Sequence, residues 1–320
     1  MTTATASPSG AASIETPALE AVAEERDSDQ PDRGILSVFD RRRPGVRVAM
    51  VGVHVVLLVG LVVAGLGPIL WLAKAAVTTT QDSIQQPLAL WPSGIDGANL
   101  TQAWLDVEVG QYFGNTLVLA FGAWITQLVV ATTAGYGLSV LRPRYAKVLN
   151  GAVLATLFIP TVVLLVPLYL SVVRPVIGVS LLNNYWGVWL PATANAFSIV
   201  LVTRFFDNLP REIFEAARVD GAGAFRVFWS IVLPMSRPIL GVVSVFALIA
   251  SLKDYLWPSL ILTDPDIQSL GVRLPAIQSF VEIDVLLAAL AIATTIPIAL
   301  FLVFQRVFLR SAGLGGAVKG

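Results

Sequence analysis

Six long hydrophobic blocks alternate with shorter polar stretches along this chain. Each block holds about 20 or more predominantly apolar residues, the length that an α-helix needs to cross the hydrocarbon core of a bilayer. The blocks run over about 48–75, 115–141, 149–173, 185–203, 239–263 and 285–309. Pro160 and Pro167 interrupt the third block, which predicts a kinked helix there. The pattern predicts an all-α membrane protein with six transmembrane helices.

The first 45 residues differ from the rest of the chain. They are rich in Ser, Thr, Ala, Glu and Asp and nearly free of large apolar side chains. Such a segment buries too little apolar surface to offset the entropy of ordering, so residues 1–45 are predicted to be a disordered tail. The start lacks the basic region of a secretory signal, and the first hydrophobic block is too long and too late for one. Residues 46–320 are expected to form the transmembrane domain.

Composition supports the membrane assignment. The chain is 56% hydrophobic and 13% charged, with a mean hydropathy of +0.76. A soluble domain of 320 residues cannot bury that much apolar surface, so lipid must be the solvent. Cysteine is absent, which excludes disulfides, thiolate metal sites and a cysteine nucleophile.

The placement of basic residues predicts the orientation in the membrane. Seventeen of the 21 lysines and arginines lie in the N-terminal tail, in the connections after the second and fourth blocks, and at the C-terminus. Lys74, Arg174 and Arg273 lie on the opposite side, and Lys253 lies within the fifth block. Because basic residues concentrate on the cytoplasmic side, both termini and the fourth connection are predicted to be cytoplasmic.

A polar island over 210–234 separates the fourth and fifth blocks. Asn208 is a candidate cap for a short helix whose first turn holds Pro210 and Glu212. Gly221 can adopt the left-handed conformation that ends such a helix. Neither this helix nor the next is long enough to cross a bilayer, so the island is predicted to be a helix-turn-helix at the membrane surface.

The second half of the island carries apolar residues at helical spacing, and these are expected to anchor the element against the chain's own helices. The stripe consists of Phe225, Phe228, Trp229 and Val232, and the prolines that stop this helix are Pro234 and Pro238.

The island also carries a motif of fixed residue types at fixed separations. Its members are Glu215, Ala216, Ala217, Asp220, Gly221, Ile231, Leu233 and Pro234. This pattern resembles the EAA loop of ABC-importer membrane subunits. Flanking segments resemble the carbohydrate-importer branch of that family, in particular the second maltose permease subunit. They are FGNT at 113–116, FIP at 158–160, VPLY at 166–169, FF at 205–206 and QRVFLRSAGLGGAVKG at 305–320.

The resemblance covers roughly residues 46–320 and implies a permease subunit of an ATP-driven, binding-protein-dependent sugar importer in a bacterial or archaeal cytoplasmic membrane. Its implied partners are a second permease subunit, two P-loop ATPase subunits that bind ATP and Mg, an extracytoplasmic solute-binding protein, the sugar and membrane lipid. The EAA residues would couple this subunit to the ATPases. The alternative within this family is an importer of another polar solute, such as a polyol, glycerol phosphate or peptide.

No catalytic machinery is expected in this chain. The sequence contains no G-x-x-x-x-G-K-[ST] loop to hold phosphates and no H-E-x-x-H metal spacing, and its single histidine, His54, lies among valines. We therefore expect no catalytic, cofactor-binding or metal-binding residues and no nucleic-acid partner. A self-contained secondary transporter is the alternative class, which should show coupling-ion residues or inverted repeats. The EAA motif favours the importer.

Ionisable and aromatic residues inside the fifth block are candidates for the translocation pathway. Charged groups within a bilayer are costly, so they normally face the bundle interior or a wet path. The candidates are Asp254, Tyr255 and Trp257, together with Asn195 in the fourth block. The family often reads Trp-Asn-Asp/Glu-Phe at this place, and Leu252 and Lys253 replace the first two residues here. The candidates either line the path or fix helix contacts.

Overall fold

The computed structural model describes residues 44–87, 89, 91, 94–175 and 178–313, so the predicted tail over 1–45 lies almost wholly outside the described residues. All regular structure within these ranges is helical, which confirms the all-α prediction. The chain divides into two compact units, Met1–Gly67 and Pro68–Gly320. Each unit is described by itself below.

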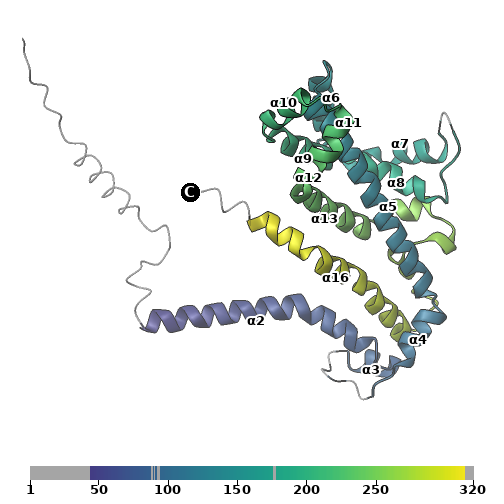
Figure 1. Cartoon of the computed structure of the whole chain (residues 1–320). Helices are drawn as coiled ribbons and strands as arrows, with labels where there is room; N and C mark the ends of the chain where they lie inside the picture. Colours follow the sequence, from purple (N-terminus) through teal and green to yellow (C-terminus); the bar gives the residue numbers. More distant parts are fainter. Residues whose placement is uncertain (1–43, 88, 90, 92–93, 176–177, 314–320) are drawn as a thin grey trace, which may run out of the picture. The chain divides into compact units, whose positions relative to one another are not determined.

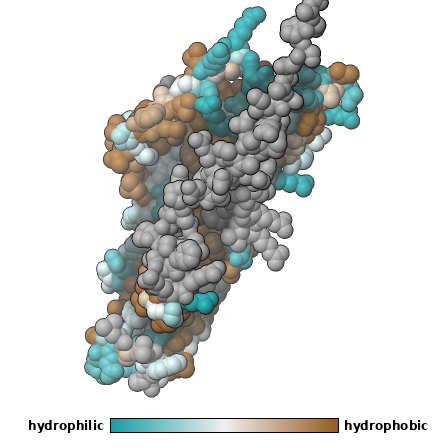
Figure 2. Space-filling view, turned by 90° about the vertical axis from the view of Figure 1, so that its left-hand side faces the viewer, coloured by the Kyte–Doolittle hydropathy of each residue, from teal (hydrophilic) through white to brown (hydrophobic). Residues whose placement is uncertain are grey.

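The described part of the first unit belongs to a single helix, α2 (Pro44–Ala75), which continues into the second unit. Its 32 residues correspond to the first hydrophobic block and would extend about 48 Å at the usual rise per residue. Large apolar side chains cover it, and most of those between Val48 and Leu66 are exposed. An apolar helix surface of this kind requires lipid or another apolar helix beside it. Apolar side chains also cover much of the molecular face shown in Figure 2.

Helix α5 is the central element of the second unit. It runs over Val109–Tyr136 and continues as a π-helical turn, η2, over Gly137–Leu141. In Figure 1 it extends from α4 to the group of helices that includes α6, α10 and α11. The helices packed along it are α8 (Tyr185–Thr193), α9 (Ala196–Asp207) and α13 (Arg237–Lys253). Small buried residues permit this close packing, and a Cβ atom at Gly135 would lie 2.9 Å from Val202.

The third and fourth hydrophobic blocks each form two helices rather than one. Helices α6 (Ala146–Thr156) and α7 (Thr161–Val173) meet at an angle of 109°, with Pro160 at the start of α7. The kink predicted in this block is therefore present at Pro160, whereas the second predicted interruption, Pro167, lies inside α7. Helices α8 and α9 are bent by 44°, where the sequence predicted one continuous span. The bend occurs where the Asn195 side chain caps a new helix, and the pair can still form one broken span.

The fifth block also departs from a single helix. Helix α13 ends at Lys253, and α14 (Leu256–Ile261) begins after a two-residue break. The Asp254 carboxylate accepts a hydrogen bond from the Trp257 backbone N–H, which satisfies a free donor in the first turn of α14. The segment predicted as the fifth span, 239–263, therefore contains a break between two helices.

Among the described residues, three helical segments are long and apolar enough to cross a membrane: α2, Val109–Leu141, and the Ile283–Val303 part of α16 (Ile283–Gly313). The number rises to six if each of three bent pairs counts as one span. The third pair joins Ala224–Met235 to α13 at 77°. The regular structure of this part of the chain is therefore helical, with three to six candidate spans.

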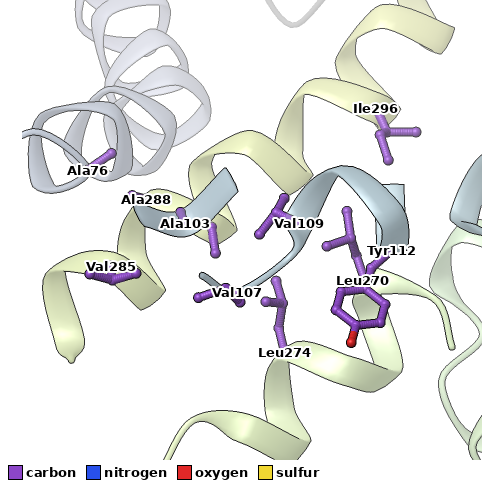
Figure 3. Close-up of a cluster of buried hydrophobic side chains, with 11 residues drawn as sticks. Ala76, Ala103, Val107, Val109, Tyr112, Leu270, Leu274, Val285, Ala288 and Ile296 are labelled. Atoms are coloured by element: carbon purple, nitrogen blue, oxygen red, sulfur yellow. The ribbon is translucent and has the colours of Figure 1, made fainter. Parts of the chain in front are cut away.

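Short helices close one end of the second unit: α3 (Thr80–Gln85), α4 (Ala98–Leu105), η4 (Pro265–Ile267) and α15 (Leu270–Ile277). A buried apolar cluster joins α4, α5, α15 and α16 there. Figure 3 shows Val107 and Val109 near Leu274, and Tyr112 beside Leu270. Burial of this cluster fixes α15 against the start of α5.

Candidate functional site

Two regions hold the residues that the sequence analysis selected. The first is the helical elbow, which we define as α10 (Arg211–Val219), the following turn, α11 (Ala224–Val227), the π-helical η3 (Phe228–Val232) and α12 (Leu233–Met235). The second is a central cavity among α5, α7, α8, α13 and α14.

Gly221 makes the turn of the elbow, as the sequence predicted. Its φ of +72° is left-handed, a conformation that glycine adopts without strain. The Gly221 N–H donates to the Arg218 carbonyl at 3.0 Å, and the Ala222 N–H donates to the Ala217 carbonyl at 2.9 Å. These two bonds form a Schellman motif, which satisfies carbonyls at the end of α10. The turn therefore has a definite geometry.

The start of α10 differs from the prediction. Pro210 occupies the N-cap position, and its side chain makes no capping hydrogen bond. Asn208 instead follows the end of α9, where its backbone N–H bonds to the Phe205 carbonyl. The predicted Asn208 cap was wrong because two residues, Leu209 and Pro210, separate it from the first helical residue.

The predicted apolar stripe is only partly buried. Phe228 and Val232 pack inside, together with Val227, whereas Phe225 and Trp229 are 76% and 55% exposed. The predicted stripe was based on the regular α-helical period of 3.6 residues. Residues 228–232 instead form a π-helical turn, which has a longer repeat. Phe225 and Trp229 therefore do not anchor the elbow as expected.

The elbow exposes part of the motif and buries the rest. The side chains of Glu215, Ala216, Asp220 and Gly221 are exposed, and so is Pro234, whereas Ala217 is buried. Ile231 and Leu233 are partly buried. A surface hollow is lined by Ile213, Ala216, Ala217, Asp220, Ala222, Arg226, Ser230 and Ile231. Glu215 lines a separate hollow, and Leu233 and Pro234 line neither.

The C-terminal end of α5 holds the elbow at two points. The Tyr136 hydroxyl donates to the Ala224 carbonyl at 2.8 Å, and the Tyr136 ring lies 5.0 Å from that of Phe228. Arg142 then pairs with Asp207 at 2.9 Å, next to the start of the elbow. Both charged groups are partly exposed, so this pair adds little stability but fixes position.

The central cavity has a volume of about 460 Å³. Its wall is mainly apolar, with polar side chains at a few points, the usual composition of a small-molecule site. The polar lining residues are Thr116, Gln127, Thr161, Asn195, Ser251, Asp254 and Ser269. None of the lining residues, all of which the structure describes, is a lysine or an arginine.

Three of the four pathway candidates line this cavity. Asn195 and Asp254 lie at the two helix breaks, and Trp257 is buried with its indole N–H bonded to the Gly187 carbonyl at 3.1 Å. Asn195 caps α9 through a 2.9 Å bond from the Ser198 N–H. Tyr255 is half exposed and is not part of the lining. The structure thus brings together candidates from separate hydrophobic blocks.

Sequence reasoning missed Gln127. Its side chain is buried, and its Nε2 donates to the Ser198 hydroxyl at 2.6 Å beside the cavity. An amide in the middle of an apolar block is the signal that could have identified it. Lys253 does not line the cavity. No group of three or more metal-ligating side chains occurs within the part of the chain that the structure describes.

Comparison with known proteins identifies the family. Residues 127–313 match the model of the binding-protein-dependent transport system inner membrane component. The chain belongs to this family. The matched region is more than half of the chain and contains the elbow, Asn195 and Asp254. The resemblance inferred from the motif is therefore confirmed.

Two relatives carry transport names. The sn-glycerol-3-phosphate transport system permease protein of Yersinia enterocolitica is 30% identical over 270 residues, which cover 80% of this chain and 93% of that protein. The diacetylchitobiose uptake system permease protein of Streptomyces coelicolor is 29% identical over 245 residues, covering 75% of this chain and 80% of that protein.

A solved structure shares the fold. A chain in the crystal structure of a bacterial ABC transporter involved in the import of the acidic polysaccharide alginate superimposes with a TM-score of 0.73. The match covers 85% of this chain and 99% of that chain at 22% sequence identity. The helical arrangement is therefore a permease fold.

Proposed function

We propose that this chain is a permease subunit of an ATP-driven, binding-protein-dependent carbohydrate importer. It forms half of the translocation pathway, with a second permease subunit as the other half. Two P-loop ATPase subunits bind ATP and Mg, and an extracytoplasmic binding protein delivers the solute. The observation that carries this proposal is the elbow, a rigid surface turn that exposes the motif residues and is held to α5.

The burial pattern divides the coupling residues into two groups. Glu215, Ala216, Asp220 and Gly221 are exposed and are available to contact an ATPase surface. Ala217 packs against the permease itself. Ile231, Leu233 and Pro234 complete the second arm of the elbow, and the first two are partly buried. The elbow thus has one side for the partner and one side for this subunit.

The proposed topology has six spans, in which each bent region crosses the membrane once. The basic residues around the elbow support a cytoplasmic position for it, on the side proposed for the ATPases and both termini. In this arrangement residues 46–320 form the transmembrane domain and residues 1–45 a cytoplasmic tail.

The lining of the cavity favours an uncharged hydroxylated solute. Asn195 and Asp254 supply groups that bond hydroxyls, and Trp257 supplies an aromatic surface. A phosphate ester would require cations, and this half of the pathway offers none among the lining residues. Carbohydrate is therefore preferred to glycerol phosphate, although one relative is named for the latter. Measuring how strongly carbohydrate and glycerol phosphate each compete for uptake distinguishes these two solute classes.

Substitution of Gly221 tests the coupling role. A Cβ atom there meets nothing within 4 Å, but a valine would have to adopt φ +72°, which a β-branched residue strongly disfavours. We expect Gly221→Val to distort the turn and abolish ATP-driven transport while the protein remains in the membrane. Gly223→Val is the matched control, because Gly223 also faces open space and has an ordinary φ of −70°. Normal transport by Gly221→Val would contradict the coupling role.

A further inference from the structure

Three side chains near the start of α5 hold the backbone of residues 266–270. Gln111 Nε2 donates to the Asp266 carbonyl at 2.9 Å. Asn115 Nδ2 donates to the carbonyls of Asp266 at 2.8 Å and Gln268 at 3.0 Å. The next residue, Thr116, accepts the Leu270 N–H at 2.9 Å through its hydroxyl. Four hydrogen bonds therefore join two segments that lie about 150 residues apart in sequence.

A neighbouring tyrosine fixes the orientation of the Asn115 amide. The Tyr185 hydroxyl donates to Asn115 Oδ1 at 3.0 Å, which leaves Nδ2 directed at the two carbonyls. The loop is also held from its other side, because Asn183 Oδ1 accepts the backbone N–H groups of Thr263 and Asp264 at 2.7 and 2.9 Å. The loop after α14 is thus tethered to α5 and to the residues before α8.

The tethered loop forms a wall of the central cavity. Ser269 and Gly271 line the cavity, and so does Thr116, which bonds directly to the loop. Leu270 and Leu274 are buried beside α5 and prevent the loop from moving outward while the packing is intact (Figure 3). The bonds from α5 to the loop therefore hold this part of the cavity wall in place.

Helix α5 connects this tether with the elbow. The segment Val109–Leu141 is 33 residues long and is not interrupted by a bend, so it extends about 50 Å. Its first turns hold the loop, and Tyr136 near its other end holds the elbow (Figure 1). Arg142, directly after the segment, pairs with Asp207 at the end of α9. A displacement of the elbow would therefore be transmitted along one helix to the tether.

We propose that Asn115, supported by Gln111 and Thr116, is a latch that keeps the cavity closed at the end remote from the elbow, and that its release accompanies opening toward the binding protein. The proposal rests on the proposed function, because it assigns the elbow to the ATPases. Asn115 acts here as a positioning residue: it contacts the loop and not the transported solute.

The first test measures ATP hydrolysis by the reconstituted complex without binding protein. Asn115→Leu keeps the size of the side chain and removes both donated hydrogen bonds. We expect hydrolysis without binding protein to rise roughly tenfold, because losing two such bonds shifts the closed–open equilibrium by that order. Gln102→Leu is the control, since Gln102 is exposed on α4 and no bond from its side chain to the loop is present.

The outcomes separate the latch from the coupling role. A defect that was only structural would lower hydrolysis with and without binding protein alike, and would overturn the latch. The latch would also be overturned if Asn115→Leu and Gln102→Leu hydrolysed ATP at equal rates without binding protein. A wild-type complex that assembles but does not hydrolyse ATP would instead contradict the proposed function.

A crosslink provides the second test, which can test the latch even if the Asn115→Leu variant does not assemble into the complex. The chain has no cysteine, so the exposed pair Gln111→Cys and Asp266→Cys can be joined selectively with a short cleavable thiol reagent. We expect the crosslinked complex to lose transport and to regain it when the linker is cleaved. Each single-cysteine variant should transport at the same rate before and after treatment with the reagent, because it has no second thiol to join. Full transport by the crosslinked complex would overturn the latch.

Discussion

At the scale of single residues, Gly122 lets α5 pack closely against Trp189 of α8. A Cβ atom at this position would overlap the indole of Trp189, whose N–H donates to the Leu119 carbonyl at 3.2 Å. We expect Gly122→Ala to destabilise the protein by about 1–3 kcal/mol, because a close-packed contact becomes overpacked. The thermal midpoint of the detergent-solubilised protein measures this effect.

The matched control is Gly114→Ala on the same helix. A Cβ atom there meets nothing within 4 Å, so the substitution should be neutral or stabilise by about 0.5–1 kcal/mol through its better helix propensity. Equal thermal midpoints for the two variants would contradict the packing described for Gly122.

Asp254 offers a test that separates charge from structure. Its carboxylate accepts the Trp257 N–H, and an asparagine oxygen can accept the same bond. Asp254→Asn should therefore leave α14 and complex assembly intact while lowering the rate of solute transport, if the carboxylate bonds the solute in the cavity. Uptake measurements with a parallel assay of assembly check this, and unchanged uptake would remove Asp254 from the pathway.

The residue scale also shows what the sequence could and could not predict. The left-handed turn at Gly221 was predictable because it depends on one local property, the freedom of glycine at positive φ. The exposure of Phe225 and Trp229 was not, because a regular helical spacing predicts neither the π-helical turn at 228–232 nor which face of the element packs against α5. The polar contact of Gln127 with Ser198 depends on the packing of two helices 71 residues apart in sequence.

At the scale of elements, α5 positions the elbow through the Tyr136 hydroxyl. Tyr136→Phe removes this bond to the Ala224 carbonyl and keeps the contact with Phe228. We expect the transport rate per ATP hydrolysed to fall about two- to tenfold, the effect of losing one hydrogen bond from the coupled state. The ratio of solute uptake to phosphate release is the measurement.

Tyr145→Phe is the control for this change, since Tyr145 is 64% exposed. It should leave the coupling ratio as in the wild type. A Tyr136→Phe variant with the wild-type ratio would show that α5 does not hold the elbow in the working complex.

The elements themselves were predicted unevenly. Hydropathy locates apolar blocks, and α2, α5 and α16 appear close to where it placed them. It does not detect bends, because an apolar run has the same composition whether it is straight or broken. The breaks at Asn195 and Asp254 arise from single side chains that cap a new helix inside an apolar block. Pro160 was the one break with a strong signal in the sequence.

At the scale of the whole molecule, exposed apolar surface limits what this chain can do alone. Helix α2 exposes most of its large apolar side chains, and α7 exposes about half of them, including Val162, Val163 and Val166. Such surfaces fit lipid and the second permease subunit that we propose as partner. The sequence identifies the family through the motif, whereas the solute depends on a cavity that, in the proposed importer, the partner subunit would complete.

The most direct measurement of the central claim is a pull-down of the full chain, solubilised in mild detergent from its native membrane, with every co-purifying protein identified. The account predicts that a P-loop ATPase and a second permease subunit of the same family co-purify, and that the Gly221→Val variant retains the permease but loses the ATPase. A chain that purifies alone and transports solute in liposomes without ATP would contradict the account and indicate a secondary transporter.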